Sequence, residues 1–223
     1  MILRTMTALL ALQLTAPLAL EYAPPPSPPE NSLDSEVIVL NVGLNEDGFP
    51  NHAQVELGAA SFTAPVVAAV REWKFRNETR KPQMVSVTVF FRARTIFPDQ
   101  TRYLTGFADR RDPGDAPPLP INVTDPGFPP TSVAEGIVIV QVDVDAQGEP
   151  AEIHVVNAVD SLTHGTVQTI RQWRFRPAIR GGRAVPGTAI VAISYLRPVV
   201  VGLTNGPVTS PRQSRPGRFV DPH

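Results

Sequence analysis

Histidine and carboxylate side chains are the groups most able to do chemistry in this sequence, and their spacing does not predict an enzyme. The four histidines lie far apart, and none has a cysteine or a second histidine at a metal-binding spacing; they are His52, His154, His164 and His223. None has a convincing partner nucleophile or orienting acid nearby, as a catalytic triad would need. We therefore expect no catalytic residue, no metal site and no cofactor.

A short acidic stretch could instead bind calcium. Asp143, Asp145 and Gln147 precede Gly148, which resembles the start of a calcium-binding loop, but the glutamate expected at its twelfth position is missing. The sequence also lacks the glycine-rich motifs that cradle phosphates. A β-hairpin turn explains these residues better, since glycine adopts a positive φ at little cost.

Charge and composition bound the class of protein. The 20 basic and 21 acidic residues give a net charge of −1, so no partner nucleic acid is indicated. Cysteine is absent, which excludes disulfides and thiolate metal sites. Proline occurs 25 times, about twice the average usage of roughly 5%. The prolines cluster in three regions, which predicts segments outside the folded units.

The first twenty residues, "MILRTMTALLALQLTAPLAL", combine one early arginine with a short apolar stretch. This stretch is shorter than the roughly 20 apolar residues that a membrane-spanning helix needs. Residues 1–20 are therefore predicted to be a cleaved signal peptide or a retained short anchor. The sequence "YAPPPSPPENSLDS" makes residues 21–35 a Pro-rich linker.

The rest of the chain contains an internal repeat. "REWKFR" at 71–76 is answered by "RQWRFR" at 171–176, and the segments 36–94 and 135–197 align around these strings. We call them unit 1 and unit 2. Each begins with alternating apolar residues, a turn glycine (Gly48 or Gly148) and a second alternating run, which predicts a β-hairpin.

A helix and a third strand follow each hairpin. In unit 1, Phe62, Val66, Val70 and Trp73 form one apolar stripe at helical spacing. Phe75 faces the same way once the chain becomes extended, so the Trp-x-Phe string marks the change of period from helix to strand. The alternating runs "MVSVTVFFR" and "TAIVAISYLR" predict the closing strands. The expected core positions of the two units are Trp73, Phe75, Trp173, Phe175, Gly48 and Gly148.

The predicted fold is therefore α+β, with two tandem ββαβ units, each a three-stranded antiparallel sheet with one helix packed on a face. Each unit has about sixty residues, which is near the lower limit for an independent core. Residues 95–134 are predicted to be a second Pro-rich linker, and residues 198–223 a disordered tail.

Unit 2 resembles the C-terminal domain of TonB-type energy transducers. The residues that carry the resemblance are Gly136 through Val144, Gly148, "IRQWRFRPA" at 170–178 and the last strand through Tyr195. Unit 1 resembles a degenerate copy, because it keeps Gly48 and "VREWKF" but has "RNETRKP" at 76–82. The resemblance implies tandem TonB C-terminal-like domains.

In that family the last strand lies at a sheet edge, where segments of outer-membrane receptors add as an extra strand. Carried over to this chain, the resemblance gives these partner-binding residues: Thr188, Ile190, Ala192, Ser194, Tyr195, Met84, Ser86 and Thr88. The alternative is that the two edge strands pair with each other, or with a second copy of the chain, and bind nothing else.

The expected function is thus that of a non-enzymatic, exported protein-binding module in envelope transport, located in the periplasm. Its partner would be an envelope protein or peptide, such as an outer-membrane receptor. Two alternatives are a transducer anchored in the inner membrane by a retained residue 1–20 segment, and a structural protein that self-associates through its sheet edges. The short apolar segment and the brief proline run depart from the long spanning helix and rod of a force-transmitting transducer.

Overall fold

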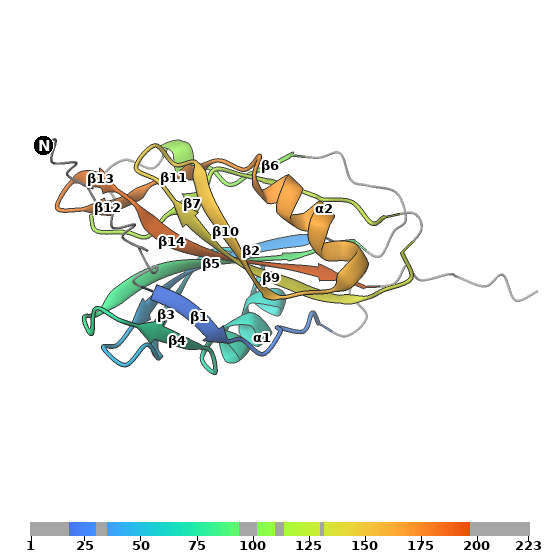
Figure 1. Ribbon diagram of the computed structural model, residues 1–223, viewed down its shortest axis with the longest axis horizontal. Coiled ribbons are helices and arrows are strands. Elements are labelled where there is room, and N and C mark those ends of the chain that lie inside the picture. The colour runs from blue at the N-terminus through green and yellow to red at the C-terminus, as the bar shows by residue number, and fades with distance from the viewer. Residues whose placement is uncertain (1–17, 30–34, 94–101, 110–113, 130–131, 197–223) are drawn as a thin grey trace, which may run out of the picture.

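One continuous sheet organises the molecule. The computed structural model describes residues 18–29, 35–93, 102–109, 114–129 and 132–196. Its centre is a six-stranded sheet in the order β10–β9–β14–β5–β2–β3 (Figure 1). These strands are β2 (Glu36–Leu44), β3 (Pro50–Leu57), β5 (Gln83–Phe91), β9 (Gly136–Val144), β10 (Pro150–Asn157) and β14 (Gly187–Tyr195).

The prediction of two separate three-stranded sheets is wrong. The ββαβ order of each unit is present, but the closing strands β5 and β14 pair with each other in parallel and join both units into the one sheet. Both strands carry apolar residues on both faces, which is typical of strands buried on both sides. Separate sheets would leave one side of each such strand in water.

The two helices cover opposite faces of this sheet. Helix α1 (Ala60–Val70) contacts β2 and β3, and α2 (Asp160–Ile170) contacts β9 and β10. Two apolar cores result, one around α1 and the other around α2, and Figure 1 shows the helices on either side of the strands. Parallel central strands and helices on opposite faces mean that an approximate twofold axis along the strands relates the units.

The corner after each helix is buried as one block. Trp73 and Trp173 are fully buried, and the phenylalanines that follow at 75 and 175 are 1% exposed. The hairpin turn reaches this corner directly, because the Phe175 amide donates to the Gly148 carbonyl at 2.9 Å. Gly148 has a φ of +84°, and a Cβ there would lie 1.9 Å from the Phe175 carbonyl oxygen. The turn therefore requires glycine on both counts.

Short strands accompany the main sheet, in segments that composition assigned to linkers. β1 (Leu18–Tyr22) pairs with β4 (Lys74–Asn77), although its residues fall in the expected leader and first linker. Within the expected second linker lie β6 (Arg102–Leu104), the 3₁₀ turn η1 (Phe107–Asp109), β7 (Leu119–Pro120) and β8 (Asn122–Thr124). The remaining strands are β11 (Phe175–Arg176), β12 (Ala178–Arg180) and β13 (Arg183–Val185). The expected tail 198–223 lies outside the described residues.

A buried ion pair links unit 1 to the segment that precedes unit 2. Arg92, which follows β5 of unit 1, pairs through both Nε and Nη2 with the carboxylate of Asp125, which precedes unit 2. The Arg92 guanidinium carbon lies 5.1 Å from the centre of the Tyr195 ring on β14. Burial raises the pKa of Tyr195 to about 12, against the opposing effect of its hydrogen bond with Thr166. The ion pair with Asp125 and the packing of Arg92 on Tyr195 thus hold the end of β5 against unit 2 and the segment before it.

The seam between β5 and β14 carries buried hydroxyls, which gives a stability prediction. The Thr88 hydroxyl is fully buried and has no hydrogen-bond partner among the described residues. Since an unpaired buried polar group costs about 1–3 kcal/mol, Thr88→Val should raise the free energy of unfolding by about 1 kcal/mol in urea denaturation. Thr166→Val is the matched control, because that buried hydroxyl bonds the Leu162 carbonyl and the Tyr195 hydroxyl. It should lower stability, and equal effects of the two changes would contradict the prediction.

Candidate functional site

The residues expected to bind a partner lie in the middle of the sheet. Five of them are on β14 (Thr188, Ile190, Ala192, Ser194 and Tyr195) and three on β5 (Met84, Ser86 and Thr88). Each strand pairs with the other and with its own hairpin, so the expectation that they are edges is wrong. The alternative that the two edges pair with each other describes this structure. That these eight residues bind a partner stays a prediction. Such binding would require strands β5 and β14 to separate.

The outer edges of the sheet are instead β3 and β10, the second strands of the two hairpins. Among the described strands, each has a sheet neighbour on one side only, and the other side of an edge strand can offer backbone N–H and C=O groups. Val55 on β3 and Val155 on β10 are 44% and 45% exposed. Each of the two edges therefore combines a side that lacks a strand partner in the described part of the chain with an exposed apolar side chain.

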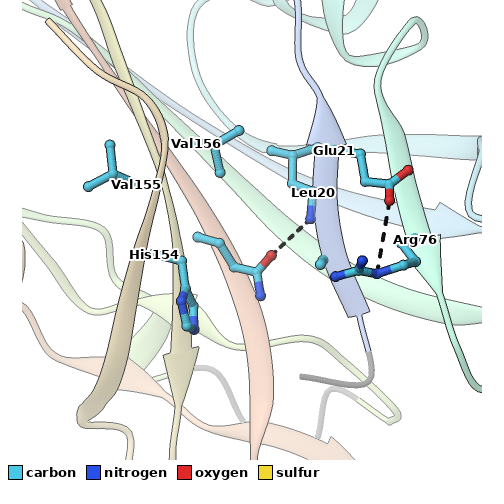
Figure 2. A pocket seen from close by; sticks show the side chains of 8 residues that line it. Leu20, Glu21, Arg76, His154, Val155 and Val156 are labelled. Carbon is cyan, nitrogen blue, oxygen red and sulfur yellow. Dashed lines mark hydrogen bonds and ion pairs between the residues drawn. The ribbon is translucent and has the colours of Figure 1, made fainter. Parts of the chain in front are cut away.

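A groove runs beside the β10 edge (Figure 2). Its volume is about 370 Å³; its lining residues are Ala19, Leu20, Glu21, Arg76, Gln141, His154, Val155 and Val156. One wall is therefore β1 with β4, and the other is β10. Strand β1 precedes unit 1 and pairs with its strand β4, whereas β10 belongs to unit 2. The groove therefore exists only because the units share one sheet.

The Gln141 side chain holds β1 in place as a neighbouring strand would. Its Oε1 accepts a hydrogen bond from the Leu20 amide at 3.0 Å, and its Nε2 donates to the Leu18 carbonyl at 3.0 Å. A primary amide has the same donor and acceptor as a peptide group, so it can cap the backbone of β1. On the far side of β1, Glu21 lies 3.9 Å from Arg76 of β4.

A similar groove lies beside β3, as the approximate twofold axis requires. Its volume is about 350 Å³, and the segment before unit 2 supplies one wall through Asp115, Ala116 and Leu119. Asn41 takes the place of Gln141 in this groove. In each groove, therefore, one wall comes from the segment that precedes the other unit.

The tether at Gln141 gives a second prediction. Gln141→Leu keeps a side chain out to Cδ but removes the amide oxygen and nitrogen, which leaves the Leu20 amide and the Leu18 carbonyl without this partner. We expect the free energy of unfolding to fall by about 1–3 kcal/mol and hydrogen exchange at the Leu20 amide to speed up. The change Asn41→Leu in the opposite groove is the control. Slow exchange at Leu20 in the Gln141 variant would show that β4 alone holds β1.

A cluster of titratable groups lies at the end of the β10 groove. His154 Nε2 is 3.4 Å from Asp143 Oδ2 and 3.7 Å from Glu152 Oε2. Among the described residues these three could hold a metal ion, since their ligand atoms lie within 4.8 Å of one another. Histidine spacing in the sequence missed this group. The hairpin register, which places Glu152 opposite Asp143, could have found it.

Comparison with known proteins places unit 2 in a family. Residues 132–196 match the family described as Gram-negative bacterial TonB protein C-terminal. This chain therefore carries one TonB C-terminal domain. The match does not extend to unit 1, so it does not show a degenerate first copy.

A curated relative supports the same assignment. The chain is 36% identical over 63 residues to "Protein tonB2" of Pseudomonas aeruginosa, a stretch that is 27% of this chain and 23% of the relative. The aligned stretch thus spans less than a quarter of the relative's length. No solved structure matches the chain.

The matched residues 132–196 are less than a third of the chain. Members of the matched family are typically non-enzymatic, act in the cell envelope on the periplasmic side, and interact with outer-membrane receptors. Within the described residues, neither helix is long and apolar enough to cross a membrane.

Proposed function

We propose that this chain is an exported, non-enzymatic binding module that takes an extended segment of an envelope protein as an extra strand at an outer edge of its sheet. The second domain is of TonB C-terminal type, and unit 1 is a diverged copy of it, supported by the shared order of hairpin, helix and closing strand. The segment comes from an outer-membrane receptor, as the family implies. The chain acts in the periplasm.

One observation supports this proposal most directly. Strands β5 and β14 pair with each other, so β3 and β10 are the outer strands of the sheet to which a peptide strand could be added. An edge strand binds an extended peptide mainly through backbone hydrogen bonds, and side-chain pockets supply specificity. Both outer edges have such a pocket beside them. The predicted mode of binding is therefore retained, but its place moves from the last strand of each unit to the second.

The test uses defined peptides. Synthetic peptides from the N-terminal periplasmic segments of outer-membrane receptors are titrated into the ¹⁵N-labelled full chain, and backbone amide shifts are followed. Shifts along β3 or β10 are the expected result. Shifts confined to β5 and β14 would show that the central pair opens instead, and the absence of shifts in all four strands would overturn the proposal.

Two variants separate the outer edges. Val155→Asp removes the exposed apolar side chain from β10, and Val55→Asp does the same on β3, at almost equal exposure. The variant that weakens peptide binding identifies the edge in use, because aspartate is poorly suited to strands. Loss in neither variant would place the peptide elsewhere.

The membrane-anchored transducer differs from this proposal in the fate of residues 1–20. A mature chain sequenced from its N-terminus should begin after part of that segment if the protein is released into the periplasm. A retained N-terminus in the membrane fraction would favour transduction. Light scattering tests the self-associating alternative, because a monodisperse monomer counts against it.

A further inference from the structure

Two carboxylates face each other across the β9–β10 hairpin. Asp143 and Glu152 are directly opposite in the register, and like charges at such a position destabilise a sheet. Their side chains are 28% and 68% exposed, on the side of the sheet where His154 lies in the groove. A cation placed between these carboxylates would relieve the repulsion.

The fold does not require this pair. At the equivalent positions of unit 1 stand Gly43 and His52, with Gln54 in place of His154, and the β2–β3 hairpin forms there with the same register. The acidic pair is therefore a property of the β10 edge alone. Such a difference between two copies of one hairpin indicates a difference in what each edge binds.

Hydrogen bonds fix the orientation of the Asp143 carboxylate. Asp143 Oδ1 accepts hydrogen bonds from Gln141 Nε2 at 3.3 Å and from Thr188 Oγ1 at 3.4 Å. Oδ2 is left on the side of His154 and Glu152. Arg76, the arginine among the described lining residues, lies 3.9 Å from Glu21 and 3.6 Å from Glu78. The groove therefore has an acidic end.

We propose that the β10 edge, and not the β3 edge, is the receptor site, and that it takes an extended peptide with a lysine or arginine at the row of Glu152. This deepens the proposed function and rests on it. A strand added to β10 would lie about 4.8 Å away, which brings its facing side chain within about 5 Å of Glu152 at Cβ. A long basic side chain reaches from there to Asp143.

The groove suits the rest of such a peptide. Leu20 and Val156 line the groove further along, and Val156 is four residues, about 13 Å, from Glu152. They therefore face a later side chain of the peptide, while the charged head stays in water near the carboxylates. The residues on the other side of the peptide strand share the side of the sheet on which Val155 is exposed, which favours apolar residues there. The expected segment thus has apolar residues around one basic residue.

The probe is a blocked peptide that alternates valine and threonine around one central lysine, with a second peptide in which norleucine replaces the lysine. Binding to the full chain is measured by fluorescence anisotropy with a chelator present, and the site is located by amide shifts. The lysine peptide should bind about fivefold more tightly, the effect of an exposed ion pair at its upper range. High salt should reduce this preference.

The double variant Asp143→Asn/Glu152→Gln tests the assignment of the charges. It should remove the preference for lysine and leave the affinity for the norleucine peptide unchanged. Glu56→Gln, in the groove beside β3, is the matched control and should keep the preference. A preference that survives the double variant would overturn the proposal.

The remaining outcomes distinguish a failure of this inference from a failure of the proposed function. Equal binding of both peptides along β10 would refute the acidic receptor site and leave strand addition standing. Binding along β3 alone would refute the choice of edge. Changes of β10 shifts with protein concentration, or on deletion of residues 198–223, would identify a second copy or the chain's own basic tail as the occupant, and either would overturn the proposal.

Discussion

Trp173→Ala is expected to lower the free energy of unfolding by about 3–5 kcal/mol, as truncation of a large buried aromatic residue does. The indole is fully buried, and its ring centre lies 6.3 Å from that of Phe175. Removing it opens a cavity under α2 at the corner where the helix rejoins the chain. Because both units share one sheet, the loss should appear as a single transition of the whole chain.

Urea denaturation can test this with two probes. Far-ultraviolet circular dichroism follows the sheet and helices, and the fluorescence of Trp73, the tryptophan that remains, follows unit 1. Coincident transitions at a lower midpoint are the expected result. Val133→Ala, at an exposed position, is the control. An unchanged midpoint would mean that the indole does not hold the corner together, and two separate transitions would mean that the units unfold independently.

The second large effect is expected at the ion pair between the units. Arg92→Ala leaves the Asp125 carboxylate buried without its partner, and breaking a buried pair from one side typically costs about 3–5 kcal/mol. Both side chains are almost fully buried, at 1% and 3% exposure. The Gly127 amide also donates to Asp125 at 2.8 Å, so the carboxylate cannot simply turn away.

A double replacement separates charge from packing. Arg92→Met together with Asp125→Leu removes both charges and keeps much of the volume, and such changes are often neutral or stabilising. The double variant should therefore recover most of the stability lost in Arg92→Ala. Equal losses in both variants, measured by thermal or urea unfolding, would show that the packing of Arg92 on Tyr195 matters more than its charge.

The local structure of each unit was predictable because it depends on near neighbours in the sequence. The turn glycines, the apolar stripe before Trp73 and the change of period at Phe75 are all local patterns, and the structure places a turn, a helix and a strand there. The repeat in the sequence also predicted that the two units share one order of hairpin, helix and closing strand. Local patterns could not reveal how the units combine, because that pairing joins residues about a hundred positions apart.

A signal for the shared sheet was nevertheless present. In β5, Val85, Val87 and Val89 face one core, and Phe90 faces the other. Alternation alone suggested a strand with one wet face, but two consecutive phenylalanines put an apolar residue on each face, as in a central strand. The groove beside β10 could not be predicted for another reason. Its wall β1 lies in a segment whose apolar and Pro-rich composition indicates a leader and a linker.

The parallel pairing of β5 with β14 also bears on how the domain behaves when it is cut from its neighbour. In the intact chain the two strands are tethered, so they meet at a high effective concentration whatever the amount of protein in solution. A fragment of residues 132–196 would expose one long side of β14, flanked by apolar side chains. Two such fragments should pair through β14 and form a twofold homodimer, whose stability falls as the protein is diluted. In the intact chain, the covalent link between the two halves replaces this dimerisation by an intramolecular pairing.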